Sequence, residues 1–273
     1  MEIRSILVNL EIDAFSPALV KCASGVTLRF GAELTGFTAA QPSAGLIGLD
    51  GTGATSNWHL LERADIEVQL RKLQHNFRAQ VPSDIVSNWR AYVDAPNRGL
   101  SASAHVADLI VTGSRLGDNV GYGRSADVGE LVLTAGRPVM AVGAGVGEIR
   151  ADKIVVGWKD TREARRALAD ALPLLKVASE VTVAAISEGD PGLERARLDE
   201  VLTWLRRHDV KARGEVYDPG HGNAETLDDV ARSFEADLIV AGGYGHSRLR
   251  EWLFGGITRD LLAHKTSNRF MSN

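Results

Sequence analysis

One stretch of this sequence occurs twice. Residues 107–114 read ADLIVTGS and residues 236–243 read ADLIVAGG, and each is a short apolar run that ends at a glycine. The opening run at residues 5–8 (SILV) likewise returns at residues 153–156 (KIVV). Copies about 130 to 150 residues apart are typical of a duplicated domain and too widely spaced for a short-repeat solenoid. The chain is therefore expected to fold as two similar units.

Within each copy, short apolar runs alternate with amphipathic helical stretches. Runs such as Ile154–Val156 and Leu238–Val240 are apolar on both faces of a strand, as in a sheet covered by helices on both sides. Strands are predicted at 6–10, 34–39, 89–93, 109–112, 139–142, 154–157, 181–186, 210–217 and 238–241. Helices are predicted up to residue 28, at 60–78, near 101, and at 161–177, 193–207 and 224–234. This pattern predicts a parallel, doubly wound α/β fold, formed twice.

Composition shifts suggest where the two units begin and end. Residues 41–58 are rich in glycine, have no helical or strand period, and are interpreted as an insertion in the first copy. Residues 143–147 (GAGVG) form a flexible joint, which predicts domains at 1–143 and 150–273. The last stretch, Ser267–Ser272, is polar and short, so if the two halves pair there, the second copy is expected to contribute a weak edge to the joint.

The composition excludes several classes of protein. No run of about 18 apolar residues exists, so a membrane span is not expected. The net charge is −4 and the basic residues are scattered, which argues against a nucleic-acid surface. The N-terminus has no secretory leader and reads directly as a strand, so a cytoplasmic protein is expected. The single cysteine, Cys22, is interpreted as a core residue.

A glycine-rich loop follows the second copy of the repeated stretch. It contains Gly242, Gly243 and Gly245, followed by His246 and Ser247, and a glycine pair follows at residues 255–256. Glycines let backbone N–H groups converge on an anion, and a following helix directs its positive end to the same place. A phosphate-binding loop is one interpretation, in which His246 would donate to the phosphate. A tight turn without a ligand is the other.

These residues resemble the nucleotide signature of the universal stress protein family. That signature is Gly, two residues, Gly, nine residues, then Gly followed by Ser or Thr. Gly242, Gly245 and Gly255 match its spacing, whereas Gly256 takes the Ser/Thr place and Thr258 provides the nearest hydroxyl. The run at residues 158–164 (WKDTREA) also resembles the start of the family's two-domain members. With the duplication, the resemblance spans essentially the whole chain.

The resemblance implies two αβα sandwich domains with five-stranded parallel sheets, paired through their last strands as a built-in dimer. It also implies that some members bind ATP and others do not. Carried over to this chain, the loop and the glycine pair would wrap the phosphates and ribose, and Mg²⁺ would accompany ATP. The turn after the strand would meet adenine or ribose, and the backbone near Val183 and Ala184 would touch the base. The turn residues are Trp158, Lys159, Asp160 and Thr161.

Two departures from the family pattern bear on this expectation. ATP-binding members usually have an acid where this chain has Lys159, with Asp160 one position later; lysine cannot accept a hydrogen bond but can reach an anion. Gly256 lacks the hydroxyl and keeps only its backbone N–H. In the first copy, the motif after Gly113 has decayed further, so that copy is interpreted as a structural partner.

Signatures of common enzymes are missing from the sequence. It has no phosphate-binding Gly-x-x-x-x-Gly-Lys-Ser/Thr loop, no Gly-x-Ser-x-Gly elbow and no His-Glu-x-x-His pair. We therefore expect a stress-response module that binds or senses ATP, or another adenine nucleotide, in its second domain. A scaffold of the same fold that needs no nucleotide and a slow ATP hydrolase are the alternatives. Further association into a homodimer is compatible with the sequence.

Overall fold

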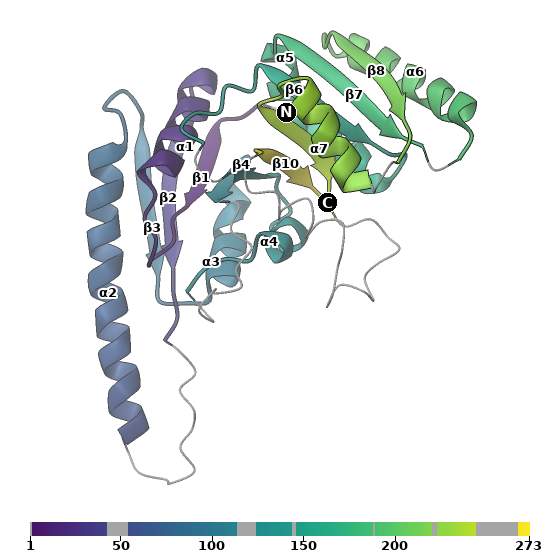
Figure 1. The fold of residues 1–273 in the computed structure, drawn as a ribbon. Coiled ribbons are helices and arrows are strands. Elements are labelled where there is room, and N and C mark those ends of the chain that lie inside the picture. Colours follow the sequence, from purple (N-terminus) through teal and green to yellow (C-terminus); the bar gives the residue numbers. More distant parts are fainter. Residues whose placement is uncertain are drawn as a thin grey trace.

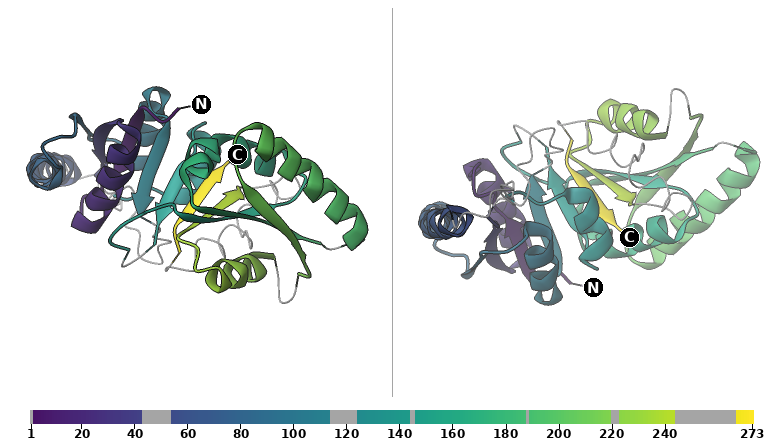
Figure 2. Two further views of the ribbon diagram at one scale, coloured as in Figure 1. Left: turned by 90° about the horizontal axis from the view of Figure 1, so that it is seen from above. Right: turned by 90° about the horizontal axis from the view of Figure 1, so that it is seen from below.

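The computed structural model describes residues 2–42, 54–113, 124–143, 146–187, 189–219, 223–243 and 267–273. One sheet runs through the whole molecule, and helices lie against both of its faces (Figures 1 and 2). No helix in the described ranges is long and apolar enough to cross a membrane. The molecule is thus an α/β protein, as the alternation of apolar runs and amphipathic stretches predicts.

The first half of the chain contains five strands and four α-helices. The strands are β1 (Ser5–Asn9), β2 (Glu33–Ala39), β3 (Ser87–Tyr92), β4 (Leu109–Gly113) and β5 (Val139–Val142). The helices are α1 (Pro17–Phe30), α2 (Ala54–Gln80), α3 (Pro96–Ser103), a short 3-10 helix η1 (Ala104–Val106) and α4 (Val128–Thr134). Helix α1 begins where the Ser16 hydroxyl accepts the Leu19 N–H, and it ends at Gly31, whose φ of 58° suits glycine.

The second half repeats this arrangement. Its strands are β6 (Lys153–Trp158), β7 (Glu180–Ile186), β8 (Ala212–Tyr217), β9 (Leu238–Gly242) and β10 (Arg269–Ser272). Its described helices are α5 (Arg162–Val177), α6 (Pro191–Arg207) and α7 (Asn223–Ser233). Side chains of Thr161 and Asp190 cap α5 and α6 by accepting backbone N–H groups of the first turn.

The ten strands form a single sheet in the order β3-β2-β1-β4-β5-β10-β9-β6-β7-β8. Neighbouring strands are parallel except for β5 and β10, which pair antiparallel with Met140 opposite Phe270. Each half is therefore a five-stranded parallel sheet, and the halves pair through their last strands. This confirms the expected tandem, doubly wound fold with an intramolecular pseudo-dimer.

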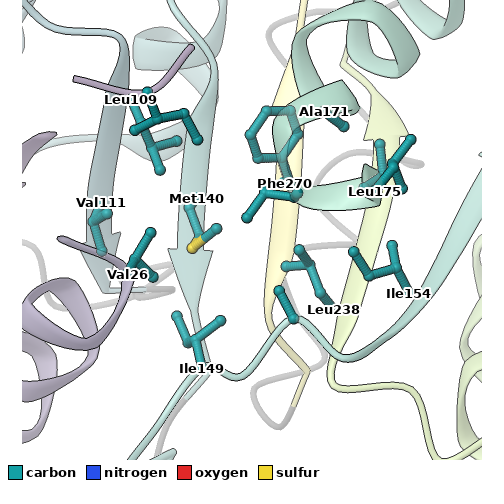
Figure 3. Packing of buried hydrophobic residues seen from close by; sticks show 14 of the residues in the cluster. Val26, Leu109, Val111, Met140, Ile149, Ile154, Ala171, Leu175, Leu238 and Phe270 are labelled. Atoms are coloured by element: carbon teal, nitrogen blue, oxygen red, sulfur yellow. The ribbon is translucent and has the colours of Figure 1, made fainter. Parts of the chain in front are cut away.

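The helices divide between the two faces of the sheet. Helices α1, α2, α5 and α6 cover one face, and α3, α4 and α7 cover the other. On the first face the core continues across the joint: Figure 3 shows Val26 of α1 and Leu175 of α5 on either side of Met140 and Phe270. The two halves thus share one hydrophobic core.

The repeated Ala-Asp pair has the same structural role in both halves. The Asp108 carboxylate, just before β4, accepts the backbone N–H groups of Arg4 and Ser5 at 2.8 and 3.0 Å. Its twin Asp237, just before β9, accepts the N–H of Asp152 at 2.9 Å. Each aspartate therefore fixes the chain entering the neighbouring strand, β1 or β6. Burial raises the pKa of Asp237 above its usual range.

The last strand pairs at the joint between the halves as expected, but it is not weak there. All four residues of β10 are buried, and β10 is bonded to both β9 and β5. Its charged residue, Arg269, is 2% exposed and meets Asp228 of α7 at 2.7 and 2.9 Å. A buried charge is tolerated when it is paired, and the partner comes from a helix distant in sequence.

Two helices also differ from their predictions. Helix α2 begins at Ala54, inside the segment that was expected to be irregular, and residues 43–53 of that segment lie outside the described residues. Helix α4 was not predicted at all; its start is defined by Asp127, whose side chain accepts the Glu130 N–H at 2.7 Å. Of the predicted flexible joint, residues 144–145 lie outside the described part of the chain.

Candidate functional site

The winding direction of the second half reverses between β6 and β9. From β6 the chain winds outward through β7 to β8, and it then returns to place β9 on the other side of β6. In doubly wound folds, ligands bind beyond the carboxyl ends of the strands at this reversal. Here those ends are Trp158 and Gly242, and both belong to segments that the sequence predicts to form the site.

The turn after β6 leads directly into α5. Thr161 caps the helix, because its hydroxyl accepts the Ala164 N–H at 3.2 Å. Lys159 and Asp160 are exposed, and Asp160 lies 3.3 Å from the guanidinium of Arg165. The Trp158 side chain is buried, and its indole N–H has no hydrogen-bond partner among the described residues. The turn thus places an exposed positive side chain, Lys159, at the end of β6.

Gly242 lies against the first turn of α5. A β-carbon at this position would stand 2.6 Å from the backbone nitrogen of Ala164 and 2.7 Å from the carbonyl carbon of Glu163. These are backbone atoms, so they cannot move aside as a flexible side chain can. The first glycine of the motif is therefore required by the close approach of β9 to α5, which brings the loop to the positive end of that helix.

Gly243 has a different role from the one predicted. Its N–H donates to the carbonyl of Ser272 at 2.8 Å, and its own carbonyl accepts from the Asn273 side chain at 2.9 Å. A β-carbon on Gly243 would stand 2.6 Å from Val132 of α4, across the joint between the halves. The backbone of Gly243 is thus engaged in the sheet, and its N–H does not point to an anion.

Val183 and Ala184 are also placed differently from the expectation. They lie in the middle of β7, both are fully buried, and they pair with Val156 and Gly157 on β6. Because β8 pairs with the other side of β7, their backbone is enclosed in the sheet. The end of β7 is instead formed by Ile186 and then Ser187, which is buried and whose N–H bonds to the Tyr217 carbonyl at 2.9 Å.

Four residues near the strand ends were not selected from the sequence. Besides Ser187, these are Glu163 in the first turn of α5, which is 2% exposed, and the terminal Asn273. Arg162 joins them, because its guanidinium lies 3.3 Å from Glu163 and donates to the Asn273 side chain at 3.0 Å. An acid just inside a capped helix start is a recognisable sequence signal, whereas the contacts of Asn273 arise only from the fold.

The remaining predicted site residues lie outside the described residues. These are Gly245, His246, Ser247, Gly255, Gly256 and Thr258. The structure thus brings together Trp158, Lys159, Asp160, Thr161 and the glycines at 242–243 at one edge of the sheet. Among described residues, no group of His, Cys, Asp and Glu side chains could hold a metal ion.

The equivalent place in the first half contains different chemistry. At the ends of β1 and β4, Asn9 donates to the Thr112 hydroxyl at 3.1 Å in a buried hydrogen bond. Arg124 forms two bonds of 2.7 Å to Asp13, in the loop after β1, and a third bond of 3.2 Å to Gln69 of α2. Arg124 also holds the pKa of Asp13 below its usual range. We call this pairing of side chains from three segments the Arg124 latch; it ties the loop after β1 to α2 and to the segment before α4.

Comparisons with known proteins agree with the fold. Residues 150–267 match the model of the universal stress protein family. A universal stress protein from Archaeoglobus fulgidus DSM 4304 aligns with 100% of this chain and 99% of its own, at 13% identity and a TM-score of 0.71. A putative universal stress protein from Pseudomonas aeruginosa UCBPP-PA14 aligns with 99% of this chain and 93% of its own, at 18% identity and a TM-score of 0.59.

The fold defines a tandem doubly wound α/β protein in which the strand-end residue Gly242 packs on the first turn of α5. Residues 150–267 match the universal stress protein family, and the chain as a whole has the fold of a two-domain universal stress protein. A universal stress protein in complex with cAMP also matches 45% of this chain and 96% of its own, at 20% identity, but its TM-score of 0.36 is too low to support an argument. No curated protein matches the chain.

Proposed function

We propose that this chain binds an adenine nucleotide, with ATP as the first candidate, at the carboxyl ends of β6 and β9. The observation that carries the proposal is the packing of Gly242 on the first turn of α5, at the place where the winding reverses. The glycine spacing of the family follows Gly242 in the sequence. A helix N-terminus with converging backbone N–H groups favours a phosphate.

The residues of the proposed site divide into two groups. The turn from Trp158 to Thr161 would contact the base or ribose, and Lys159 would reach toward a phosphate. The loop that follows Gly243 would supply backbone N–H groups, since Gly243 itself is bonded to Ser272. Mg²⁺ is proposed only as the companion of ATP, because it prefers phosphate oxygens and water. The proposed function of this site is to sense the nucleotide by binding it. Slow hydrolysis of ATP is proposed as a secondary activity.

The division of labour between the halves is part of the proposal. We assign residues 1–143 to a first domain and residues 150–273 to a second domain that holds the nucleotide. The Arg124 latch supports this assignment, because after β1 the first half has a loop tied by paired side chains, where the second half has the turn that leads directly into α5. The first domain then acts as a structural partner that covers β10 with β5.

A nucleotide-independent scaffold is the second candidate function. Two observations favour it: Lys159 takes the place of an acid that ATP binders of the family usually have, and the N–H of Gly243 is used by the sheet. In that case the strand-end loop would serve as a contact surface for another protein. The two candidates differ in whether the purified chain binds a nucleotide at all.

Isothermal titration calorimetry on the full chain tests the proposal. ATP, ADP, AMP and cAMP are titrated with and without Mg²⁺, after bound nucleotide has been removed and its removal checked by mass spectrometry. We expect one site per chain. Gly245→Val should weaken binding about tenfold or more, because a branched side chain blocks close approach of a ligand to the loop backbone.

The matched control is Gly113→Ala, at the end of β4 in the first half. A β-carbon on Gly113 has open space around it, so this variant should fold and bind as the unaltered chain does. Absence of binding heat with every nucleotide would exclude the nucleotide site and leave the scaffold. Equal loss in Gly245→Val and Gly113→Ala would show that the effect is not specific to the second half. Phosphate release from ATP, followed over hours, measures the secondary activity.

A further inference from the structure

Helix α2 extends beyond the sheet that it covers. Its inward side chains are Ile66, Leu70, Leu73 and Phe77, and all of them are buried. The N-terminal part of α2 projects past the strands (Figure 1), and α2 is seen end-on at the outer margin of the molecule (Figure 2).

Large apolar side chains are exposed on this part of the molecule. Trp58, Leu60 and Leu61 are 60%, 66% and 69% exposed, and Val68 further along α2 is 55% exposed. With about 100° per residue, Leu61, Val68 and His75 form a stripe opposite to the buried stripe. Leu61 and Val68, seven residues apart, are the apolar members of this exposed stripe. We call the exposed stripe and its flanking residues the outer face of α2.

The charges on the outer face indicate the identity of the partner. Asp65 precedes Val68 by three residues, Lys72 follows it by four, and both side chains are exposed. If two α2 helices pair antiparallel with their Val68 residues near the centre, Asp65 of each chain lies beside Lys72 of the other. Leu61 of each then lies near His75 of the other. Parallel pairing would instead place Asp65 beside Asp65 and Lys72 beside Lys72.

The outer face is therefore complementary to itself in the antiparallel direction. We propose that two copies of this chain associate through the outer faces of their α2 helices. The mixture of acidic and basic side chains along α2 differs from the basic face typical of helices that lie on membranes. The contact is isologous, since each chain uses the same residues, and it closes as a dimer.

Sedimentation velocity of the full chain, from about 1 to 100 μM, tests this proposal. We expect a monomer–dimer equilibrium that shifts with concentration. Leu61→Glu and Val68→Glu should each raise the dimer dissociation constant about tenfold or more, because they bring charge to the centre of an apolar contact. Leu193→Glu is the matched control: Leu193 of α6 is 51% exposed but lies outside α2, so the equilibrium should not change.

A charge exchange tests the direction of pairing. Asp65→Lys and Lys72→Asp should each weaken the dimer, and the double variant should restore it, because the two opposite charges are then exchanged. Circular dichroism verifies that every variant is folded. A chain that is monomeric over the whole concentration range would overturn the proposal. So would a dimer that is insensitive to Leu61→Glu and Val68→Glu, or binding to anionic vesicles without self-association.

Discussion

At the scale of single residues, adjacent glycines in the loop have separate duties. Gly242 allows the backbone of α5 to approach β9. Gly243 instead donates a backbone hydrogen bond to Ser272 of β10, and it lies against Val132 of the other half. The motif is usually interpreted as a cradle for phosphate, and here its first two residues also hold the sheet together. A substitution in this loop therefore reports on folding as well as on ligand binding.

Replacing Gly242 by alanine should destabilise the protein. Because the new β-carbon would meet backbone atoms of Glu163 and Ala164, β9 or α5 must shift, at a cost of about 1–3 kcal/mol. Gly113→Ala, at the equivalent strand end of the first half, meets open space and should change stability by less than about 0.5 kcal/mol. Urea denaturation of both variants measures the difference. Equal stabilities would mean that the close approach at Gly242 is not maintained in solution.

At the scale of elements, the Arg124 latch joins three segments of the first half. It connects the lead into α4 with the loop after β1 and with the middle of α2. The Arg124 side chain is 18% exposed, and the Asp13 side chain is 56% exposed. Solvent therefore screens the pair, and its contribution is expected to be about 1 kcal/mol or less.

The latch should make stability depend on pH. Arg124 lowers the pKa of Asp13 in the folded state, so the stabilisation is present above the unfolded pKa of about 3.9 and is lost as the pH falls through the lower folded value. Arg124→Ala should therefore cost more stability at pH 7 than near pH 3, in urea denaturation at both values. Arg4→Ala, which removes a pair with Glu2 that is exposed on both sides, should change little at either pH. A cost for Arg124→Ala that is the same at both values would contradict the linkage.

At the scale of the whole molecule, the two halves behave as one folding unit in our interpretation. The core on the α1 and α5 face is continuous across the antiparallel joint (Figure 3). Asn268 adds to this joint, because its side chain accepts the Gly143 N–H at 3.0 Å and donates to the Asp237 carbonyl at 3.0 Å. Separation of the halves would expose β5 and β10 as apolar edges.

Unfolding of the two halves should consequently coincide. Hydrogen exchange, measured by mass spectrometry on peptides from β1 and β6 over a urea series, should give opening free energies for the two strands that agree within about 1 kcal/mol. Shared burial is the reason, because neither half keeps its core when the other unfolds. Two separate transitions, with one half protected while the other exchanges, would show that the joint is weaker than its burial indicates.

Much of the fold could be predicted from the sequence because the signals are local. Parallel strands that are covered on both faces are apolar throughout, as at Ile154–Val156, and helix starts carry capping side chains such as Thr161. Duplication was visible because both copies keep the same Ala-Asp pair, which fixes the chain entering the neighbouring strand. The location of the candidate site at a strand end followed from the same pattern.

Other features depended on contacts between distant segments. Ser267–Ser272 looked too polar to pair strongly at the joint, and only the fold pairs Arg269 with Asp228 and places β10 between two neighbours. In the same way, only the fold encloses Val183 and Ala184 within the sheet and engages the N–H of Gly243. The length of α2 was underestimated because residues 58–61, near its start, are exposed and show no apolar period facing a core.

The sequence by itself determined two doubly wound units, their order along the chain, and a glycine loop after β9. The tertiary structure decided that the units share one sheet and one core, that the loop after β1 is tied by the Arg124 latch, and that Gly242 serves packing. The physical reason is the separation along the chain of the residues that interact. Hydrophobic periodicity and capping depend on residues a few positions apart. Pairing of buried charges and close approach of backbones are set by segments that meet only after folding.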